Sequence, residues 1–216
     1  GPIVLSVWPV IIAVLVALFI LGCIISFFQK LKYGKQVKEL DQIGMKKLSE
    51  SSSAWEEPKK LGLVEMTASG YVISSRFYKR IIQELNKEMI VTADIFQKHC
   101  LRSAASFQTE NTTPLLNHMR SQDVLVLLQE NGIRKRYLSQ KAALDCEHVF
   151  ELEGAATETE FSAICETMSI CSKISVKPEI LAKTILNYAV AKKVAHKVEL
   201  PELGEELFVS DKSKSN

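Results

Sequence analysis

The stretch IVLSVWPVIIAVLVALFILGCIISFF runs from Ile3 to Phe28 and contains 26 consecutive residues without a charged side chain. As a helix it would be roughly 39 Å long at about 1.5 Å per residue, which exceeds the roughly 30 Å hydrocarbon core of a bilayer. A cleavable signal peptide has a basic start and a shorter apolar run, and neither feature is present. The sequence therefore predicts an uncleaved transmembrane anchor with a basic stem over residues 1–38.

The orientation of this anchor follows from the charges beside it. Lys30, Lys32, Lys35 and Lys38 follow the apolar stretch, whereas no charged side chain precedes it. By the positive-inside rule, the N-terminus is expected to be lumenal and the remaining chain cytosolic. The four lysines could also attract anionic lipid, although a topology signal is the simpler interpretation. Cys23 lies towards the cytosolic end of the span and is a candidate for S-palmitoylation.

The balance of charge limits the classes of partner. The chain of 216 residues has 27 basic and 25 acidic side chains. Four of the basic and none of the acidic residues lie in residues 1–38, so 23 basic and 25 acidic residues remain and the soluble part is formally −2. That part lacks the basic excess of a nucleic-acid-binding domain, so no nucleic-acid partner is expected. The hydrophobic fraction of 47% and the charged fraction of 24% also exclude wholesale disorder.

Beyond the anchor the sequence is predicted to be all-α. Residues 39–74 are expected to be a linker, because they are rich in serine and interrupted by glycine. Residues 75–199 show apolar spacing typical of an antiparallel helical bundle or helical-hairpin stack of about six helices. Strand-like alternation and repeats of roughly 20–50 residues are not visible. The expected helix starts are Ser74 or Ser75, Thr92, Thr113 before Pro114, about Lys135, the capping box Thr157 and Glu160, and Pro178.

The polar and sulfur-containing side chains do not form a recognisable reaction centre in the sequence. The five cysteines are odd in number, which favours a reducing compartment over a disulfide framework. Cys146 and His148 would point about 200° apart on a helix and so could not share a site. Gly-rich phosphate loops and the common hydrolase and zinc motifs are also missing. We therefore predict no catalytic, cofactor-binding or metal-binding residues and no cofactor, and consider an enzyme less favoured than a binding module.

The C-terminal residues 200–216 are expected to be a flexible tail. They end in Lys212-Ser213-Lys214-Ser215-Asn216, with lysines at the third and fifth positions from the end. This pattern resembles the dilysine retrieval signal of endoplasmic-reticulum membrane proteins, which the vesicle coat reads on a cytosolic tail. The resemblance implies residence in the endoplasmic reticulum.

Together these features predict a single-pass, membrane-anchored helical interaction module, or a structural or accessory subunit of a membrane protein complex. Its expected partners are the lipid bilayer and other protein subunits. One alternative is a membrane-tethered enzyme with a site assembled from scattered residues such as His118, Cys146, Glu147 and His148. A second alternative is an accessory subunit of a mitochondrial inner-membrane complex.

Overall fold

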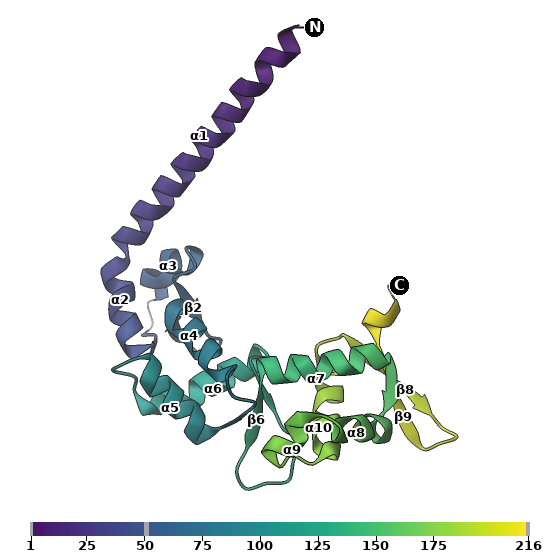
Figure 1. Ribbon diagram of the computed structural model, residues 1–216. Coiled ribbons are helices and arrows are strands. Elements are labelled where there is room, and N and C mark those ends of the chain that lie inside the picture. The colour runs from purple at the N-terminus through teal and green to yellow at the C-terminus, as the bar shows by residue number, and fades with distance from the viewer. Residues whose placement is uncertain (1, 50–51, 215–216) are drawn as a thin grey trace. The chain divides into compact units, whose positions relative to one another are not determined.

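The computed structural model describes residues 2–49 and 52–214. Figure 1 labels the helices and strands. The chain divides into two compact units. Unit 1 comprises the residues up to Tyr78 together with Ala104–Phe107. Unit 2 comprises Lys79–Ser103 and the residues from Gln108 onward.

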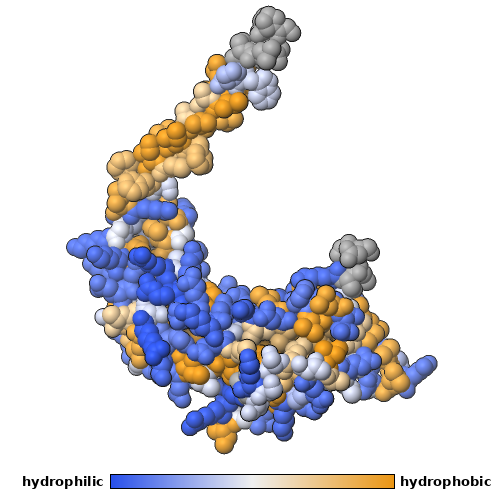
Figure 2. Space-filling view, in the orientation of Figure 1, coloured by the Kyte–Doolittle hydropathy of each residue, from blue (hydrophilic) through white to orange (hydrophobic). Residues whose placement is uncertain are grey.

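Unit 1 begins with a single long helix, α1 (Pro2–Lys32). Within its stretch from Val7 to Lys32, the most apolar 18 residues have a mean hydropathy of 3.2, and none of these residues is buried against the rest of the chain. Figure 2 shows hydrophobic side chains along most of this helix. Within the described residues, α1 is the one helix that is long and apolar enough to cross a membrane. The chain therefore has one candidate membrane-spanning helix near its N-terminus.

After α1, unit 1 contains a small three-stranded sheet and the short helices that precede and connect its strands. A buried cluster of Leu40, Trp55, Val64 and Val72 forms its core. The sheet has the strand order β1-β3-β2, and all its pairs are antiparallel. Its elements are α2 (Gly34–Ile43), β1 (Met45–Lys47), η1 (Ser52–Trp55), α3 (Glu56–Lys60), β2 (Val64–Met66) and β3 (Tyr71–Ser74).

The next segment contains a second three-stranded antiparallel sheet, with the order β4-β6-β5. Helix α4 (Ser75–Leu85) follows β3 directly, and its residues from Lys79 onward belong to unit 2. The further elements are β4 (Ile90–Thr92), α5 (Ala93–Ser103), η2 (Thr109–Asn111), α6 (Thr112–Ser121), β5 (Leu125–Leu127) and β6 (Arg136–Ser139).

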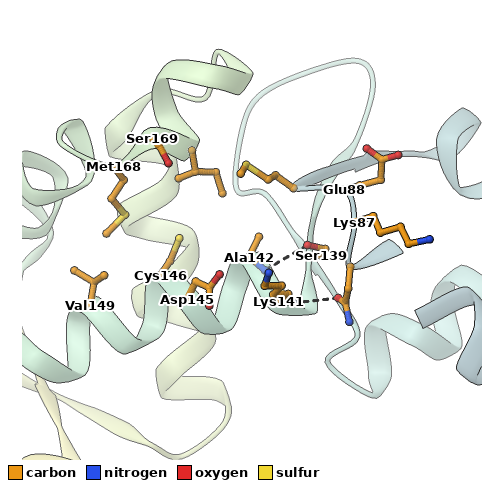
Figure 3. Close-up of a pocket in the computed structure, with 13 residues that line it drawn as sticks. Lys87, Glu88, Ser139, Lys141, Ala142, Asp145, Cys146, Val149, Met168 and Ser169 are labelled. Atoms are coloured by element: carbon orange, nitrogen blue, oxygen red, sulfur yellow. Dashed lines mark hydrogen bonds between the residues drawn. The ribbon is translucent and has the colours of Figure 1, made fainter. Parts of the chain in front are cut away.

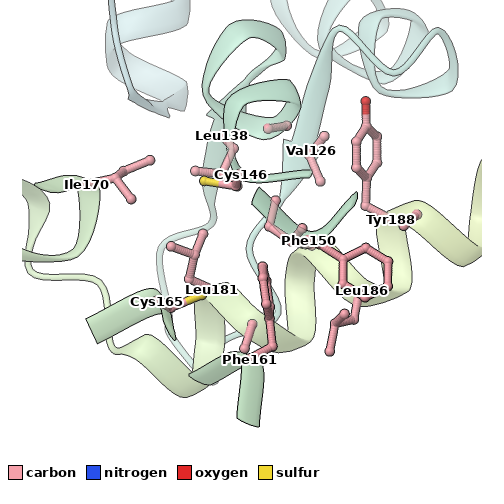
Figure 4. Close-up of a cluster of buried hydrophobic side chains, with 14 of the residues drawn as sticks. Val126, Leu138, Cys146, Phe150, Phe161, Cys165, Ile170, Leu181, Leu186 and Tyr188 are labelled. Atoms are coloured by element: carbon pink, nitrogen blue, oxygen red, sulfur yellow. The ribbon is translucent and has the colours of Figure 1, made fainter. Parts of the chain in front are cut away.

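The last segment contains the third sheet, with the order β7-β9-β8. The largest core of unit 2 joins it to its helices and to β5 and β6 (Figure 4). In that core, Phe150 and Phe161 meet edge to face with ring centroids 5.7 Å apart. The elements are α7 (Gln140–Glu153), β7 (Ala155–Thr157), α8 (Glu158–Glu166), α9 (Ser169–Ile174), α10 (Pro178–Ala191), β8 (Ala195–Leu200), β9 (Glu205–Ser210) and η3 (Asp211–Lys214).

The three sheets belong to three copies of one structural unit, which we call repeats A (residues 34–74), B (75–139) and C (140–210). Each copy runs helix, strand, helices, strand, strand, and its third strand lies between the other two. This is the topology of a winged helix, a helix-turn-helix arrangement with a terminal β-hairpin. The registers also agree, because Ser74, Ser139 and Ser210 occupy the same place opposite the first residue of the second strand.

Two backbone features recur in all three repeats. The N–H of Ser74, Ser139 and Ser210 donates to the carbonyl just before the first strand of the same repeat, at 2.9, 3.1 and 2.8 Å. In each repeat, the helix before the second strand is followed by a residue with positive φ. The N–H of the next residue then donates to the carbonyl five residues earlier in the chain. This is a Schellman ending. The left-handed residues are Gly62, Asp123 and Lys193.

The predicted all-α fold is wrong, because the described residues contain nine strands in three antiparallel sheets. Seven of the strands have only three or four residues, too few to show a period of two. The strands β1, β2 and β3 lie in residues 39–74, the expected linker, and β9 lies within the expected tail. Several helix starts are nevertheless correct, including the capping box of Thr157 and Glu160 and the proline at the start of α10.

Candidate functional site

A groove of about 340 Å³ lies between repeats B and C in unit 2 (Figure 3). It is lined by the turn before β4, by α7 between Lys141 and Val149 and by the residues that begin α9. Helix α7 is fixed at its start, because the backbone N–H of Ala142 donates to the cap oxygen of Ser139 at 3.3 Å. The N–H of Lys141 donates to Oδ1 of Asn86 at 3.2 Å. The bond to Asn86 holds the start of α7 against the turn before β4.

The apolar part of the groove contains two methionines. Met89 is 39% exposed, Met168 and Val149 are half-buried, and Ile170 is buried at the base. Methionine side chains are flexible and polarisable, and they adapt to partners of different shape. The groove is therefore suited to receive an apolar side chain of another molecule.

The polar part of the groove does not form a reaction centre. Lys87 donates to Glu84 at 2.8 Å, and Glu88 lies 3.4 Å from Nε2 of the buried His99. Lys141 and Asp145 are exposed at the rim. These charges can orient a bound chain, but no nucleophile is paired with a base among the described groove residues.

Cys146 also lines the groove, but it is not an activated thiol. It is 4% exposed, and burial raises the pKa of its thiol to about 12. Burial likewise raises the pKa of Cys100 and Cys165 to about 12, and the pKa of Cys171 is raised as well. A neutral thiol is a poor nucleophile and a poor metal ligand. Among the described residues, no group of three or more His, Cys, Asp or Glu side chains is arranged to hold a metal ion.

The interface between repeats B and C is fixed by polar contacts to α10. The backbone N–H of Gln129 donates to Oγ1 of Thr184 at 3.0 Å, and the side chain of Asn187 donates to Oε1 of Gln129 at 2.9 Å. Within repeat C, Nζ of Lys192 donates to Oε2 of Glu147 at 2.9 Å and joins the end of α10 to α7. The two bonds of Gln129 fix repeat B to repeat C, and these two repeats supply the walls of the groove.

The helices that precede the second strands carry glutamates in their first turns in two of the three repeats. In a helix-turn-helix, base edges are contacted by the N-terminal residues of the second helix. The first turn of α3 carries Glu56 and Glu57, and that of α10 carries Glu179. The first turn of α6 carries no charge, and its Arg120 lies over the ring of Tyr137. Acidic residues at these positions would repel phosphate.

The basic stem that the sequence singled out is exposed. Lys30 and Lys32 lie in the last turn of α1, and Lys35 and Lys38 lie on α2. Cys23 is also exposed, on α1. All five side chains are therefore accessible to lipid or solvent.

The two lysines of the retrieval-like pattern lie in η3, whereas the sequence predicted a flexible tail. Lys212 follows β9 within η3, and its Nζ donates to Oε1 of Glu151 on α7 at 2.7 Å. The backbone of Lys214 ends η3, and its side chain lies outside the described residues. The tail was predicted to comprise residues 200–216, and within this range β9 and η3 form regular structure.

Sequence reasoning missed the groove altogether. Met89 lies in the turn before β4, after α4 has ended at Leu85. Cys146 and His148 are not brought together, because Cys146 is buried whereas the side chain of His148 is 68% exposed. No local motif marks the groove, since its walls come from segments that are far apart in the chain.

Comparisons with known proteins do not assign the chain to a family. No protein-family model and no curated protein matches it. One solved structure that resembles it is described as methanosarcina barkeri Roco2 RocCORdC bound to GDP, with 14% sequence identity and a TM-score of 0.35. The match covers 71% of this chain and 47% of that one, so the chain spans about half the length of that structure.

Proposed function

We propose that this protein is a membrane-anchored scaffold of three winged-helix repeats that binds other proteins, as an interaction module or accessory subunit of a membrane complex. The observation that carries the proposal is the methionine-lined groove between repeats B and C, which offers binding surface without a reaction centre. The candidate membrane-spanning helix α1 supports the anchored location. The proposed ligand is an apolar side chain from a protein partner, flanked by polar groups that meet Lys141 and Asp145.

Protein is favoured over nucleic acid as the partner for two reasons. The residues after Lys38 are formally −2, so they lack the positive charge that supplies most nucleic-acid affinity. The helix starts that would enter a groove of DNA carry glutamates instead of basic side chains.

We further propose that the winged-helix repeats are cytosolic and that the protein resides in the endoplasmic reticulum. The exposed lysines at the end of α1 and on α2 support this orientation through the positive-inside rule. The retrieval-like lysines support the compartment, with one structural condition. Lys212 must leave Glu151 before a vesicle coat can bind it. A bulky tag fused after Asn216 should mask the signal and release a retrieved protein to later compartments.

The scaffold proposal is tested by purifying the full chain from native membranes in mild detergent. We expect stoichiometric partner proteins to co-purify with it. Met89→Glu and Met168→Glu each place a charge in the apolar groove and should remove the partners. Ile133→Glu is the matched control, since Ile133 is fully exposed on the β5–β6 hairpin. A particle that contains this chain alone, or equal loss in the control, would contradict the proposal.

A further inference from the structure

The β8–β9 hairpin extends beyond the helices of repeat C (Figure 1). Lys197, Val198 and Glu199 are successive residues of β8, and all three are exposed. Successive residues of a strand point to opposite faces of a sheet, so neither face is covered in this segment. Strand β8 is also an edge strand, because its one neighbour in the sheet is β9.

The backbone groups on the open edge of β8 can be identified from its pairing. The carbonyl of Val194 accepts from the N–H of Asp211 at 2.9 Å, on the β9 side of the sheet. The N–H and C=O of one residue point to the same side in an antiparallel ladder, and the side alternates along the strand. Val198 therefore bonds towards β9, whereas Lys197 and Glu199 direct their N–H and C=O groups outward.

We propose that β8 pairs with β8 of a second copy of this chain, in an antiparallel register centred on Val198. The outward groups of Lys197 then meet those of Glu199 in the second copy, and the reverse pair also forms. The result is four backbone hydrogen bonds, two cross-strand pairs of opposite charge and one pair of facing valines.

The charges select this register over its neighbours. A residue whose backbone N–H and C=O point away from β9 can form hydrogen bonds only with a residue of the second copy whose groups also point away from β9. The neighbouring registers that satisfy this condition are centred one residue before or one residue after Val198. Centring the pair on Lys197 would place two lysines opposite each other, and centring it on Glu199 would place two glutamates opposite each other. Like charges at directly opposed positions are destabilising. Pro201, which has no N–H to donate, ends the ladder beyond Glu199.

The interface of two such short strands is much smaller than the roughly 800 Å² per partner of a stable complex. Pairing in dilute solution should therefore be weak. A shared membrane raises the effective concentration of two anchored copies, as a linker does for two joined domains. The dimer is accordingly expected in membranes that hold the full chain.

The test is disulfide trapping of the full chain in phosphatidylcholine vesicles. Val198→Cys is introduced together with Cys23→Ser, because the other four native cysteines are buried. Facing residues at a non-hydrogen-bonded position lie about 4.5 Å apart between Cα atoms, which is within disulfide reach. His196→Cys is the matched control, since its two copies would lie roughly 13 Å apart in this register. We expect an oxidant to cross-link Val198→Cys and not His196→Cys.

Charge reversal tests the register independently. In the Val198→Cys background, Lys197→Glu or Glu199→Lys should lower the cross-linked fraction roughly tenfold, because both cross-strand pairs become repulsive. The double swap should restore it. Lys197 also lies 3.1 Å from Glu206 of its own chain, and Glu206 is directly opposite Glu199. Glu199→Lys keeps Lys197 beside Glu206, so its loss of cross-linking would come from the contact between the two copies. Absence of cross-linking, equal cross-linking of His196→Cys, or no recovery in the double swap would overturn the proposal, and the charges would then protect the edge.

Discussion

The ion pair between α7 and α10 allows a quantitative test of how repeat C is held together. Glu147 is 2% exposed, and its Oε2 accepts from Nζ of Lys192 at 2.9 Å. The side chain of Lys192 is 21% exposed, and its Nζ lies 4.4 Å from the ring centroid of Tyr188. Burial alone would lower the pKa of Lys192, but the hydrogen bonds to Glu147 and Tyr188 outweigh it, so this pKa is raised. The lysine is therefore charged at neutral pH.

Replacing Lys192 by methionine would leave Glu147 buried without its partner. Breaking a fully buried ion pair on one side costs about 3–5 kcal/mol. Because a fifth of the Lys192 side chain is exposed, water can reach the remaining carboxylate in part. We expect Lys192→Met to lower the free energy of unfolding by about 2–3 kcal/mol. The double variant Glu147→Leu and Lys192→Met removes both charges, so its stability should lie within about 1 kcal/mol of the wild type.

The assay is urea unfolding of the full chain in detergent, followed by far-ultraviolet circular dichroism. Lys183→Met is the matched control, because Lys183 is exposed on the same helix and should change stability by less than about 0.5 kcal/mol. Two results would refute the reasoning. The first is a Lys192→Met variant as stable as the control. The second is a double variant whose loss of unfolding free energy equals the sum of the losses in the single variants Glu147→Leu and Lys192→Met.

Three further predictions concern separate parts of the chain. Hydrogen bonds from Arg136 lower the pKa of the Glu130 carboxyl group. The stability that these bonds contribute is therefore fully present above about pH 4.3, the pKa of an unfolded glutamate, and is lost as the pH falls through the lowered pKa. Glu130→Gln should therefore flatten the acid limb of a plot of urea midpoint against pH, and an unchanged limb would contradict this. Gly44→Ala should cost about 2–4 kcal/mol, because Gly44 has a φ of +80° and a Cβ would lie 2.8 Å from the ring of Phe77. Gly62→Ala, with a φ of +71° but open space around it, should cost only about 1 kcal/mol by thermal unfolding, and equal costs would refute the steric reason. Cys146 should resist iodoacetamide at neutral pH in the folded protein and react after denaturation, as mass spectrometry would show.

Helix starts could be predicted from the sequence because capping is a local interaction. The N–H of Glu160 donates to Oγ1 of Thr157 at 3.2 Å, and the carboxylate of Glu160 accepts from the N–H of Thr157 at 2.9 Å. Both partners lie within four residues, so their spacing is visible in the sequence. The proline at the first position of α10 is a signal of the same kind.

The strands and the repeat could not be predicted in the same way. Strands of three residues are stabilised by partners far away in the sequence, as when Ile90 pairs with Leu138. The repeat is conserved in backbone geometry and hardly in side chains, since its left-handed position holds Gly62, Asp123 or Lys193. The serine that ends each third strand was the one shared residue type that could have shown the repeat. The groove was missed for the same reason, because its walls meet only after the sheets have formed.

The serines also determine how the chain would respond to tension from the membrane. Ser74 is the last residue of a strand, and its Oγ accepts from the N–H of Phe77 in the following helix, at 3.2 Å. Ser139 has the same two roles at the start of α7. The repeats are therefore connected in series without a slack linker. A pull on α1 would be carried from strand to helix through these serines, and a repeat that yields would release the cap of the next helix.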